Sequence, residues 1–214
     1  MTDTRDEFGD LLGLYDPILI ATAAIVFGAV FFALFRYRSR AGREVSGRRE
    51  ATIRESVYAV VLAVIAAVLV GATFRANDRE TRLASSPGLR VDVTAFKWQW
   101  RFEYTGQDVA PAVGTLGRPA RLVVPADTTV RFTLTSRDVI HSLWIPEVRF
   151  KRDAFPKRTT QFDLVFPRQG AFIGRCAEFC GLRHADMIFH VQVLSPAGFR
   201  SWLASQPSSA EGGG

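Results

Sequence analysis

Two long runs of apolar residues lie near the start of the chain, at 17–35 and 56–74. Each run has nineteen residues and contains no charged side chain. An α-helix rises about 1.5 Å per residue, so each run is long enough to cross a hydrocarbon core of roughly 30 Å. The pattern predicts two transmembrane helices that together form a hairpin spanning 17–74.

The alternative is a cleavable signal peptide followed by one buried helix. A signal peptide normally has a basic start, a shorter apolar stretch and a cleavage site of small residues. Here residues 1–16 carry one base and five acids, a net charge of −4, and the first run ends in Phe35-Arg36-Tyr37-Arg38. These features favour two genuine membrane spans.

The segment between the two runs is strongly basic. Residues 36–54 hold seven arginines against two glutamates, a net charge of +5. Such a segment can indicate nucleic-acid binding, but short loops rich in Arg also stay on the cytoplasmic side of a membrane. We therefore predict a bacterial-type plasma-membrane protein with no nucleic-acid partner. The loop 36–55 would be cytoplasmic, and residues 1–16 and everything after Phe74 would be periplasmic or extracellular.

The pattern changes after the second run. Residues 75–88 are polar and end in Ser-Ser-Pro-Gly, which predicts a linker. Short alternating segments rich in Val, Phe and Thr then follow at 89–104, 120–125, 128–136, 160–166 and 187–195. Segments of this kind predict an antiparallel sandwich or barrel over 89–195. Ser195 as helix cap and Pro196 at the first helical position predict a short helix, and a disordered tail completes 196–214.

The chain has a net charge of +6 and only two cysteines, and both cysteines lie in the stretch "GRCAEFCGLRHADM" at 174–187. The same stretch holds His184 and the only methionine besides Met1, in the order Cys176-x3-Cys180-x3-His184-x2-Met187. A further histidine, His141, lies upstream at a strand end. The clustering of soft donors predicts a disulfide, a zinc site or a copper site.

A disulfide between the cysteines is plausible outside the cell but leaves the histidine and methionine unexplained. Zinc suits two thiolates and two imidazoles but has no need of a thioether. A mononuclear copper site uses one cysteine, two histidines and a weak methionine, so one cysteine would be left over. Two copper ions bridged by both thiolates use every donor, which favours a dinuclear copper site.

With "VIHSLWIPE" and "FKWQWRFEY" upstream, this loop resembles subunit II of the haem–copper cytochrome c oxidases. The resemblance runs over nearly the whole chain, from the membrane hairpin to about Ser195. It implies a two-helix transmembrane hairpin plus an all-β cupredoxin-like sandwich or barrel domain holding a dinuclear copper A centre.

The resemblance also implies a function within a larger assembly. Copper A would accept electrons from cytochrome c, or from a tethered c-type cytochrome, and pass them to haem in subunit I. Oxygen would be reduced there to water with proton pumping, so the complex would be a translocating oxidoreductase. Subunits I and III would be partners, and haem would be present only in a partner subunit.

The same resemblance assigns the ligands. Both cysteines would bridge the copper ions, the two histidines would each bind one copper, and the methionine would be a weak ligand. The backbone carbonyl of Glu178 would also face copper, and its carboxylate would reach a magnesium or manganese ion shared with subunit I. The ligand set is thus His141, Cys176, Glu178, Cys180, His184 and Met187.

Four more residues are assigned by resemblance alone. Trp98 would be the point of electron entry, although Gln99 replaces a tyrosine that is frequent beside it in relatives. Glu103 and Asp138 would dock cytochrome c. However, Arg101 and Arg137 lie beside them, and residues 75–214 carry nineteen basic against thirteen acidic residues. Glu55 would lie at the mouth of a proton channel of subunit I.

Two alternatives remain open on the sequence. A nitric oxide reductase can have a copper A subunit of this shape. A membrane-anchored copper-binding or delivery module would have the same ligands without a role in electron transfer.

Overall fold

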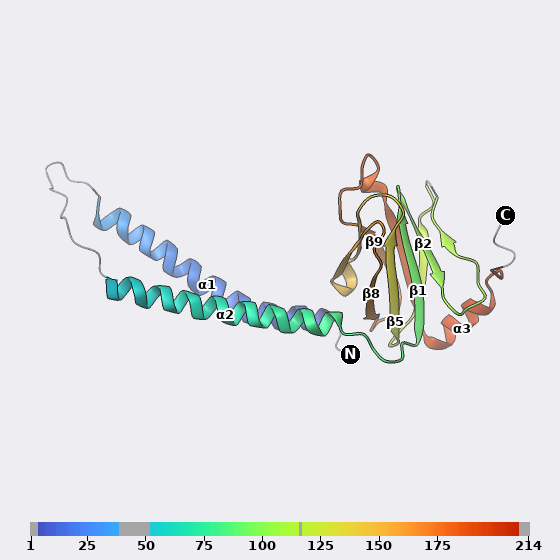
Figure 1. The fold of residues 1–214 in the computed structure, drawn as a ribbon, viewed down its shortest axis with the longest axis horizontal. Coiled ribbons are helices and arrows are strands. Elements are labelled where there is room, and N and C mark those ends of the chain that lie inside the picture. Colours follow the sequence, from blue (N-terminus) through green and yellow to red (C-terminus); the bar gives the residue numbers. More distant parts are fainter. Residues whose placement is uncertain (1–3, 39–51, 116, 210–214) are drawn as a thin grey trace. The chain divides into compact units, whose positions relative to one another are not determined.

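The computed structural model describes residues 4–38, 52–115 and 117–209. The chain divides into two compact units: one consists of 8–77, and the other of 78–214 with the first residues of the chain. Figure 1 shows the two kinds of structure, a pair of long helices and a β-sandwich. Most of the expected cytoplasmic loop lies outside the described residues.

The first unit contains most of helices α1 (Thr4–Arg36) and α2 (Thr52–Thr81). Within them, Phe8–Arg36 and Glu55–Thr81 are long and apolar enough to cross a membrane, with mean hydropathies of 2.7 and 2.6, and neither apolar stretch is buried in the protein. Both helices extend well beyond the apolar runs, because the polar residues on either side also favour helix. The Tyr15 hydroxyl of α1 donates a hydrogen bond to the carbonyl of Leu69 in α2, at 3.0 Å, which pairs the two helices.

The second unit is a sandwich of two five-stranded sheets, ordered β3-β2-β1-β5-β8 and β4-β10-β9-β6-β7. The strands are β1 (Leu89–Phe96), β2 (Gln99–Tyr104), β3 (Ala112–Val113), β4 (Ala120–Pro125), β5 (Thr129–Ser136), β6 (His141–Ile145), β7 (Phe150–Ala154), β8 (Thr160–Val165), β9 (Gly170–Cys176) and β10 (Ile188–Leu194). Short 3₁₀ turns η1 (Pro146–Val148) and η2 (His184–Asp186) interrupt the loops.

The sheets are not purely antiparallel as the alternation predicted. Strand β1 runs parallel to β5, and β10 runs parallel to β4, while the other pairs within the sheets are antiparallel. Local alternation indicates which face of a strand is buried but carries no information on the direction of its neighbour. Both parallel pairs join strands that do not follow one another in the chain, and the pair of β10 with β4 brings the end of the domain against its first half.

Aromatic side chains fill the space between the sheets. Trp100 and Phe102 of β2 each pack against Phe189 of β10, with ring centroids 5.3 and 5.2 Å apart, and all three side chains are fully buried. Phe132 of β5 stacks on Phe162 of β8 at 5.3 Å. Burying rings of this size supplies most of the driving force for closing the sandwich.

The polar residues before β1 are fixed to the sandwich. Asp163 of β8 accepts hydrogen bonds from the backbone of Ala84, at 2.7 Å, and from the guanidinium of Arg131 in β5, at 2.8 Å. The Arg131 guanidinium also donates to the carbonyl of Ala84. The last part of the expected linker 75–88 is therefore attached to the sheet.

Helix α3 (Pro196–Ala204) follows the last strand. The Ser195 hydroxyl accepts a hydrogen bond from the backbone of Gly198 at 3.0 Å, as expected of a residue that caps a helix. Further along, the backbone N–H of Ser209 donates to the Asp108 carboxylate at 3.0 Å. Residues 210–214 of the expected tail lie outside the described residues.

Candidate metal centre

The candidate centre lies at one end of the second sheet, where β9 leads through the loop 177–187 into β10. The backbone N–H of Cys176 donates to the carbonyl of Met187 at 2.9 Å, so the loop is closed by the sheet ladder. The next residue, Ala177, donates to the carbonyl of Ser142 in β6 at 3.0 Å. His141 immediately precedes Ser142 in the chain, and Cys176 immediately precedes Ala177. This hydrogen bond therefore brings the distant histidine beside the first cysteine.

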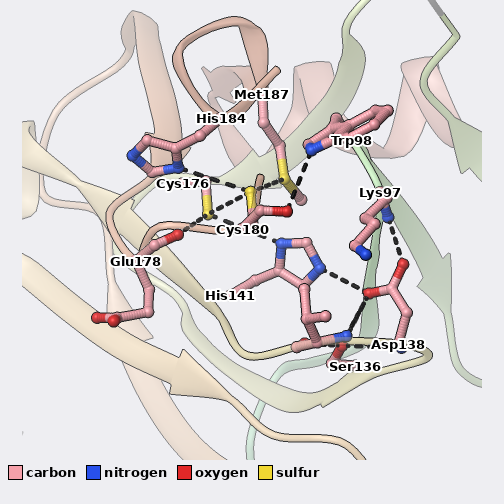
Figure 2. A network of polar contacts seen from close by, with 11 residues as sticks. Lys97, Trp98, Ser136, Asp138, His141, Cys176, Glu178, Cys180, His184 and Met187 are labelled. Carbon is pink, nitrogen blue, oxygen red and sulfur yellow. Dashed lines mark hydrogen bonds and ion pairs between the residues drawn. The ribbon is translucent and has the colours of Figure 1, made fainter. Parts of the chain in front are cut away.

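The structure gathers all the expected donor side chains (Figure 2). Both cysteines are free thiols, and their Sγ atoms lie 3.8 Å apart. Nδ1 of His141 lies 3.8 Å from Sγ of Cys176, and Nδ1 of His184 lies 3.6 Å from Sγ of Cys180. Each sulfur therefore has its own imidazole.

Two weaker donors complete the arrangement. Sδ of Met187 lies 3.7 Å from Sγ of Cys180, and the carbonyl oxygen of Glu178 lies 3.2 Å from Sγ of Cys176. Met187 and His141 are fully buried, and both cysteines are nearly so. Among the described residues, His141, Cys176 and Cys180 form a group whose ligand atoms all lie within 4.8 Å of one another, as a metal site requires.

Asp138 is the main polar partner of this group that the sequence did not assign to it. Its Oδ1 lies 2.8 Å from Nε2 of His141, and its Oδ2 accepts a hydrogen bond from the backbone of Lys97 at 2.7 Å. Burial acts to raise the pKa of the carboxyl, but these bonds lower it below its ordinary value. The ionised carboxylate thus holds the His141 ring with Nδ1 directed at the sulfur. Its position three residues before the histidine is the one signal of this role in the sequence.

The pKa values of the two thiols are shifted in opposite directions. Burial raises the pKa of Cys176, but hydrogen bonds with His141 and the backbone of Glu178 outweigh it and lower the pKa to about 6. Burial and the neighbouring Cys176 raise the pKa of Cys180 to about 12. At neutral pH the pair therefore holds one proton, and a thiolate is ready to bind a soft metal ion.

Trp98 belongs to the same cluster. Its indole Nε1 donates a hydrogen bond to the carbonyl of Cys180 at 3.2 Å, although the two residues are 82 positions apart. Gly181 follows with a φ of +116°, and a side chain there would begin 3.4 Å from the indole nitrogen. Glycine is therefore favoured here by the positive φ of the turn, while the distance to the ring would allow a side chain in ordinary contact.

The other predicted site residues lie elsewhere or make different contacts. Glu103 is exposed and forms an ion pair with Arg101 at 3.0 Å. The carboxylate of Glu178 is also exposed and lies 3.9 Å from Nζ of Lys151, which in turn contacts Asp153 at 3.2 Å. Glu55 lies in the first turn of α2, which belongs to the other unit.

The fold and this cluster define a class of protein: a β-sandwich of the cupredoxin type that carries a site of thiol, imidazole and thioether donors and follows two candidate membrane helices. Residues 89–194 match the family model of the cytochrome c oxidase subunit II periplasmic domain. A probable cytochrome c oxidase subunit 2 of Streptomyces avermitilis is 33% identical over 94% of this chain and 76% of its own length. A cytochrome c oxidase subunit 2 of Corynebacterium glutamicum is 29% identical over 73% of this chain and 59% of its own length.

The chain therefore belongs to the cytochrome c oxidase subunit II family, and it is the electron-entry subunit of a terminal oxidase. The crystal structure of the periplasmic domain of subunit II from Bradyrhizobium japonicum is similar in fold, with a TM-score of 0.53 and 26% identity. The matched region covers 58% of this chain and 96% of the Bradyrhizobium domain. The prediction of an oxidase subunit is thus confirmed over a nitric oxide reductase or a delivery module.

Proposed function

We propose that the site holds a dinuclear copper A centre. The observation that carries this proposal is the pair of free thiols 3.8 Å apart, each with one imidazole nitrogen within 3.8 Å of its sulfur. Two bridging thiolates with one terminal imidazole for each metal ion are what a dinuclear soft-metal site requires, and thiolate and thioether ligands select copper.

The weak donors strengthen the case against zinc. A tetrahedral zinc ion would be satisfied by the two cysteines and two histidines. It would leave the buried thioether of Met187 and the carbonyl of Glu178 without a function beside the sulfurs. In the proposed centre, the thioether of Met187 would be a weak ligand of one copper ion, and the carbonyl of Glu178 would be a weak ligand of the other. When bound, the copper pair spreads one transferred electron over two ions, which keeps structural change on reduction small.

The side chains around the centre would orient its ligands and direct electrons to it. The Asp138 carboxylate holds the ring of His141, and burial of His141, Met187 and both cysteines keeps water from most of the centre, while His184 is half-buried. The indole of Trp98 donates a hydrogen bond to the backbone carbonyl of Cys180, and we propose this side chain as the entry point for electrons. Electrons would come from cytochrome c, or from a tethered c-type cytochrome, and continue to haem in subunit I.

Several finer roles complete the proposal. The exposed carboxylate of Glu178 would bind a magnesium or manganese ion at the contact with subunit I. Glu103 remains the proposed docking acid for cytochrome c, and Asp138 could add its charge to the same face while holding the histidine. Glu55 is proposed at the entrance of a proton channel of subunit I. The subunit III contact and proton pumping follow from the same assignment.

The proposed position in the cell follows from charge. The arginine-rich segment 36–54 would be cytoplasmic, the two spans would be 17–35 and 56–74, and the sandwich domain at 89–195 would be periplasmic or extracellular. The periplasmic type of the matched domain supports this orientation.

A reducing partner for the two thiols is a further part of the proposal. A solved structure of a mixed disulfide between a thioredoxin-like TlpA and subunit II of cytochrome c oxidase is 26% identical to this chain, with a TM-score of 0.51. The sulfurs here lie 3.8 Å apart, so a small movement would join them in a disulfide. A thioredoxin-like protein would keep them reduced so that copper can bind.

The test is metal analysis with spectroscopy on the full chain purified in detergent and loaded with copper. We expect two copper ions per chain and an EPR signal in which one unpaired electron is shared by both. The Cys180→Ser variant should lose the shared signal, while His190→Gln, which changes the exposed histidine of β10, should keep it. One copper per wild-type chain, or zinc alone, would contradict the proposal.

A further inference from the structure

A second polar site lies between the two edge strands β7 and β8, which end the two sheets on the same side of the domain. We call it the basic pocket. It is lined by Lys151, Arg152, Asp153, Phe155, Arg158 and Thr160. Three cations and one acid give the pocket a net charge of +2, so the charge of its lining favours an anionic occupant.

The single acid of the basic pocket is already engaged. Asp153 accepts a hydrogen bond from the Ser142 hydroxyl at 2.7 Å and contacts the ammonium of Lys151 at 3.2 Å. Its charge is therefore shared mainly with Lys151. The positive charge of Arg152 also helps to lower the pKa of the Asp153 carboxyl, but no ion pair joins Asp153 to either arginine among the described residues. The two arginines are the cations that remain for an incoming anion.

Arg152 is held in place by aromatic rings. It lies on the same face of β7 as Phe150 and Ala154, which are both buried. Its guanidinium carbon lies 5.4 Å from the ring centre of Phe150 and 5.9 Å from that of Phe162 in β8. Such contacts fix the plane of the guanidinium without using its N–H groups. The arginine is thus prepositioned, with hydrogen-bond donors to spare.

Two buried polar atoms of the pocket have no hydrogen-bond partner among the residues that the structure describes. They are Nε of Arg152 and the hydroxyl oxygen of Thr160. Buried polar atoms in native proteins are nearly always hydrogen-bonded, and an unpaired one costs free energy. Arg152 and Thr160 both line the basic pocket, so an acceptor bound there is the natural partner for their unpaired atoms.

Arg158 completes the pocket on the loop between the strands. Its guanidinium carbon lies 4.9 Å from the ring centre of Phe155, and the side chain is exposed. Two guanidinium groups stacked on aromatic rings, together with a hydroxyl, are a suitable set of donors for a planar carboxylate.

We propose that the basic pocket binds the carboxylate of an aspartate or glutamate from another subunit of the oxidase. A polypeptide is favoured over a lipid headgroup because both strands of the pocket are sheet edges, where an extended segment of a partner can lie. This assignment depends on the chain being an oxidase subunit and not on its metal content. Lys151 also lies 3.9 Å from Glu178, so the pocket adjoins the loop of the metal centre.

The first experiment uses carbodiimide coupling in the intact oxidase, since this reagent joins an amine to a carboxylate that touches it. The variant Arg158→Lys keeps the charge and supplies an amine, and Arg200→Lys on α3 is the matched control. We expect mass spectrometry to find position 158 joined to an acidic residue of another subunit, with no such product from position 200. Products confined to acids of this chain, or equal in the two variants, would overturn the proposal.

The second experiment measures how firmly the chain is held in the purified oxidase. Loss of one charge-assisted hydrogen bond should speed its release in moderate salt by about tenfold or more, so we expect this of Arg152→Gln and Arg158→Gln but not of Arg200→Gln. Thr160→Val removes only the hydroxyl group. It should also speed release, and it tests the pocket even if Arg152→Gln fails to fold. Unchanged release in all pocket variants would contradict the proposal. Bound phospholipid that is lost with Arg152→Gln, without any cross-link, would identify a lipid headgroup instead and would also overturn it.

Discussion

Oδ1 of Asp138 lies 2.8 Å from Nε2 of His141, on the side of the ring opposite the nitrogen that faces Cys176. The carboxylate thereby fixes which ring nitrogen is available to a metal ion. Carboxylates placed in this way behind a metal-binding histidine orient the ring and increase its basicity. The acid that resemblance assigned to docking is, by its contacts, a positioning residue of the centre.

Replacement of this acid by asparagine should therefore weaken the centre. We expect Asp138→Asn to lower copper affinity by about tenfold to a hundredfold, because the ring loses its charged partner. Loss of a negative charge beside the centre should also raise its reduction potential. Competition titration and redox potentiometry would measure both effects. Asp127→Asn, which changes an exposed acid in the turn between β4 and β5, should leave both values unchanged.

Trp98 offers a test of electron entry that separates it from metal binding. Trp98→Phe keeps an aromatic ring but removes the N–H that bonds the carbonyl of Cys180. We expect slower reduction of the centre by cytochrome c, with two copper ions still bound, and a loss of stability of about 1 kcal/mol from the missing hydrogen bond. Stopped-flow reduction kinetics and copper analysis would measure this.

The control for this variant is Trp144→Phe, which changes a tryptophan of β6 whose ring faces Arg175 and which has no contact with the copper loop among those described. Equal slowing in the two variants would argue against a specific entry point at Trp98.

The cysteine pair predicts how the stability of the metal-free, reduced protein varies with pH. The pKa of Cys176 falls from its ordinary value of 9.0 to about 6, so between these values the unfolded chain binds more protons and stability rises with pH. The pKa of Cys180 rises from 9.0 to about 12, so the folded chain keeps its proton longer and stability falls across that interval. The contribution of the pair should be largest near pH 9.

This contribution can be isolated as the difference in Tm between the wild-type chain and the double variant Cys176→Ser/Cys180→Ser, both without metal and with reductant. The difference should rise from pH 6 to about 9 and then decline, following the pKa values of about 6 and about 12. A difference that does not vary with pH would show that the two thiols titrate as ordinary ones.

Glu178 should serve two metal sites through different atoms. Its carbonyl faces Cys176 at 3.2 Å, while its carboxylate is exposed and lies toward Lys151. Glu178→Gln leaves the carbonyl in place, so we expect two copper ions per chain to remain while manganese bound to the intact oxidase is lost. Metal analysis of oxidase from manganese-grown cells would decide, with Asp186→Asn in the same loop as the control. Loss of copper in Glu178→Gln would mean that the carboxylate also shapes the copper loop.

The sequence was most informative where chemistry is concentrated in a short stretch. The stretch 174–187 contains five of the six proposed donors in fixed order, and the apolar runs predicted two helices by length alone. Strand β9 was missed because its two glycines hide the alternation, and β7 because Lys151, Arg152 and Asp153 follow one another in it. Such strands are held in place by their neighbours rather than by their own composition.

The contacts of charged side chains could not be predicted for a different reason. The approach of Lys151 to Glu178 depends on segments that the sheet brings together, and no periodicity encodes it. The bond from Asp138 to His141 is local, but a spacing of three residues outside a regular element does not by itself predict a contact. The parallel pairing of β1 with β5 likewise follows from the closed sandwich and not from either strand alone. Sequence thus identified the donors but not the groups that orient them.

The bonds that frame the copper loop involve only atoms of the polypeptide: Cys176 to Met187 at 2.9 Å, Ala177 to Ser142 at 3.0 Å, and His184 to Gly181 at 3.0 Å. The donors are therefore gathered by the fold itself, in contrast to small zinc modules that fold only around their ion. Maturation of the subunit can then be a late step, in which copper is delivered to a finished domain. Its pace would depend on the oxidation state of two sulfur atoms rather than on any rearrangement of the chain.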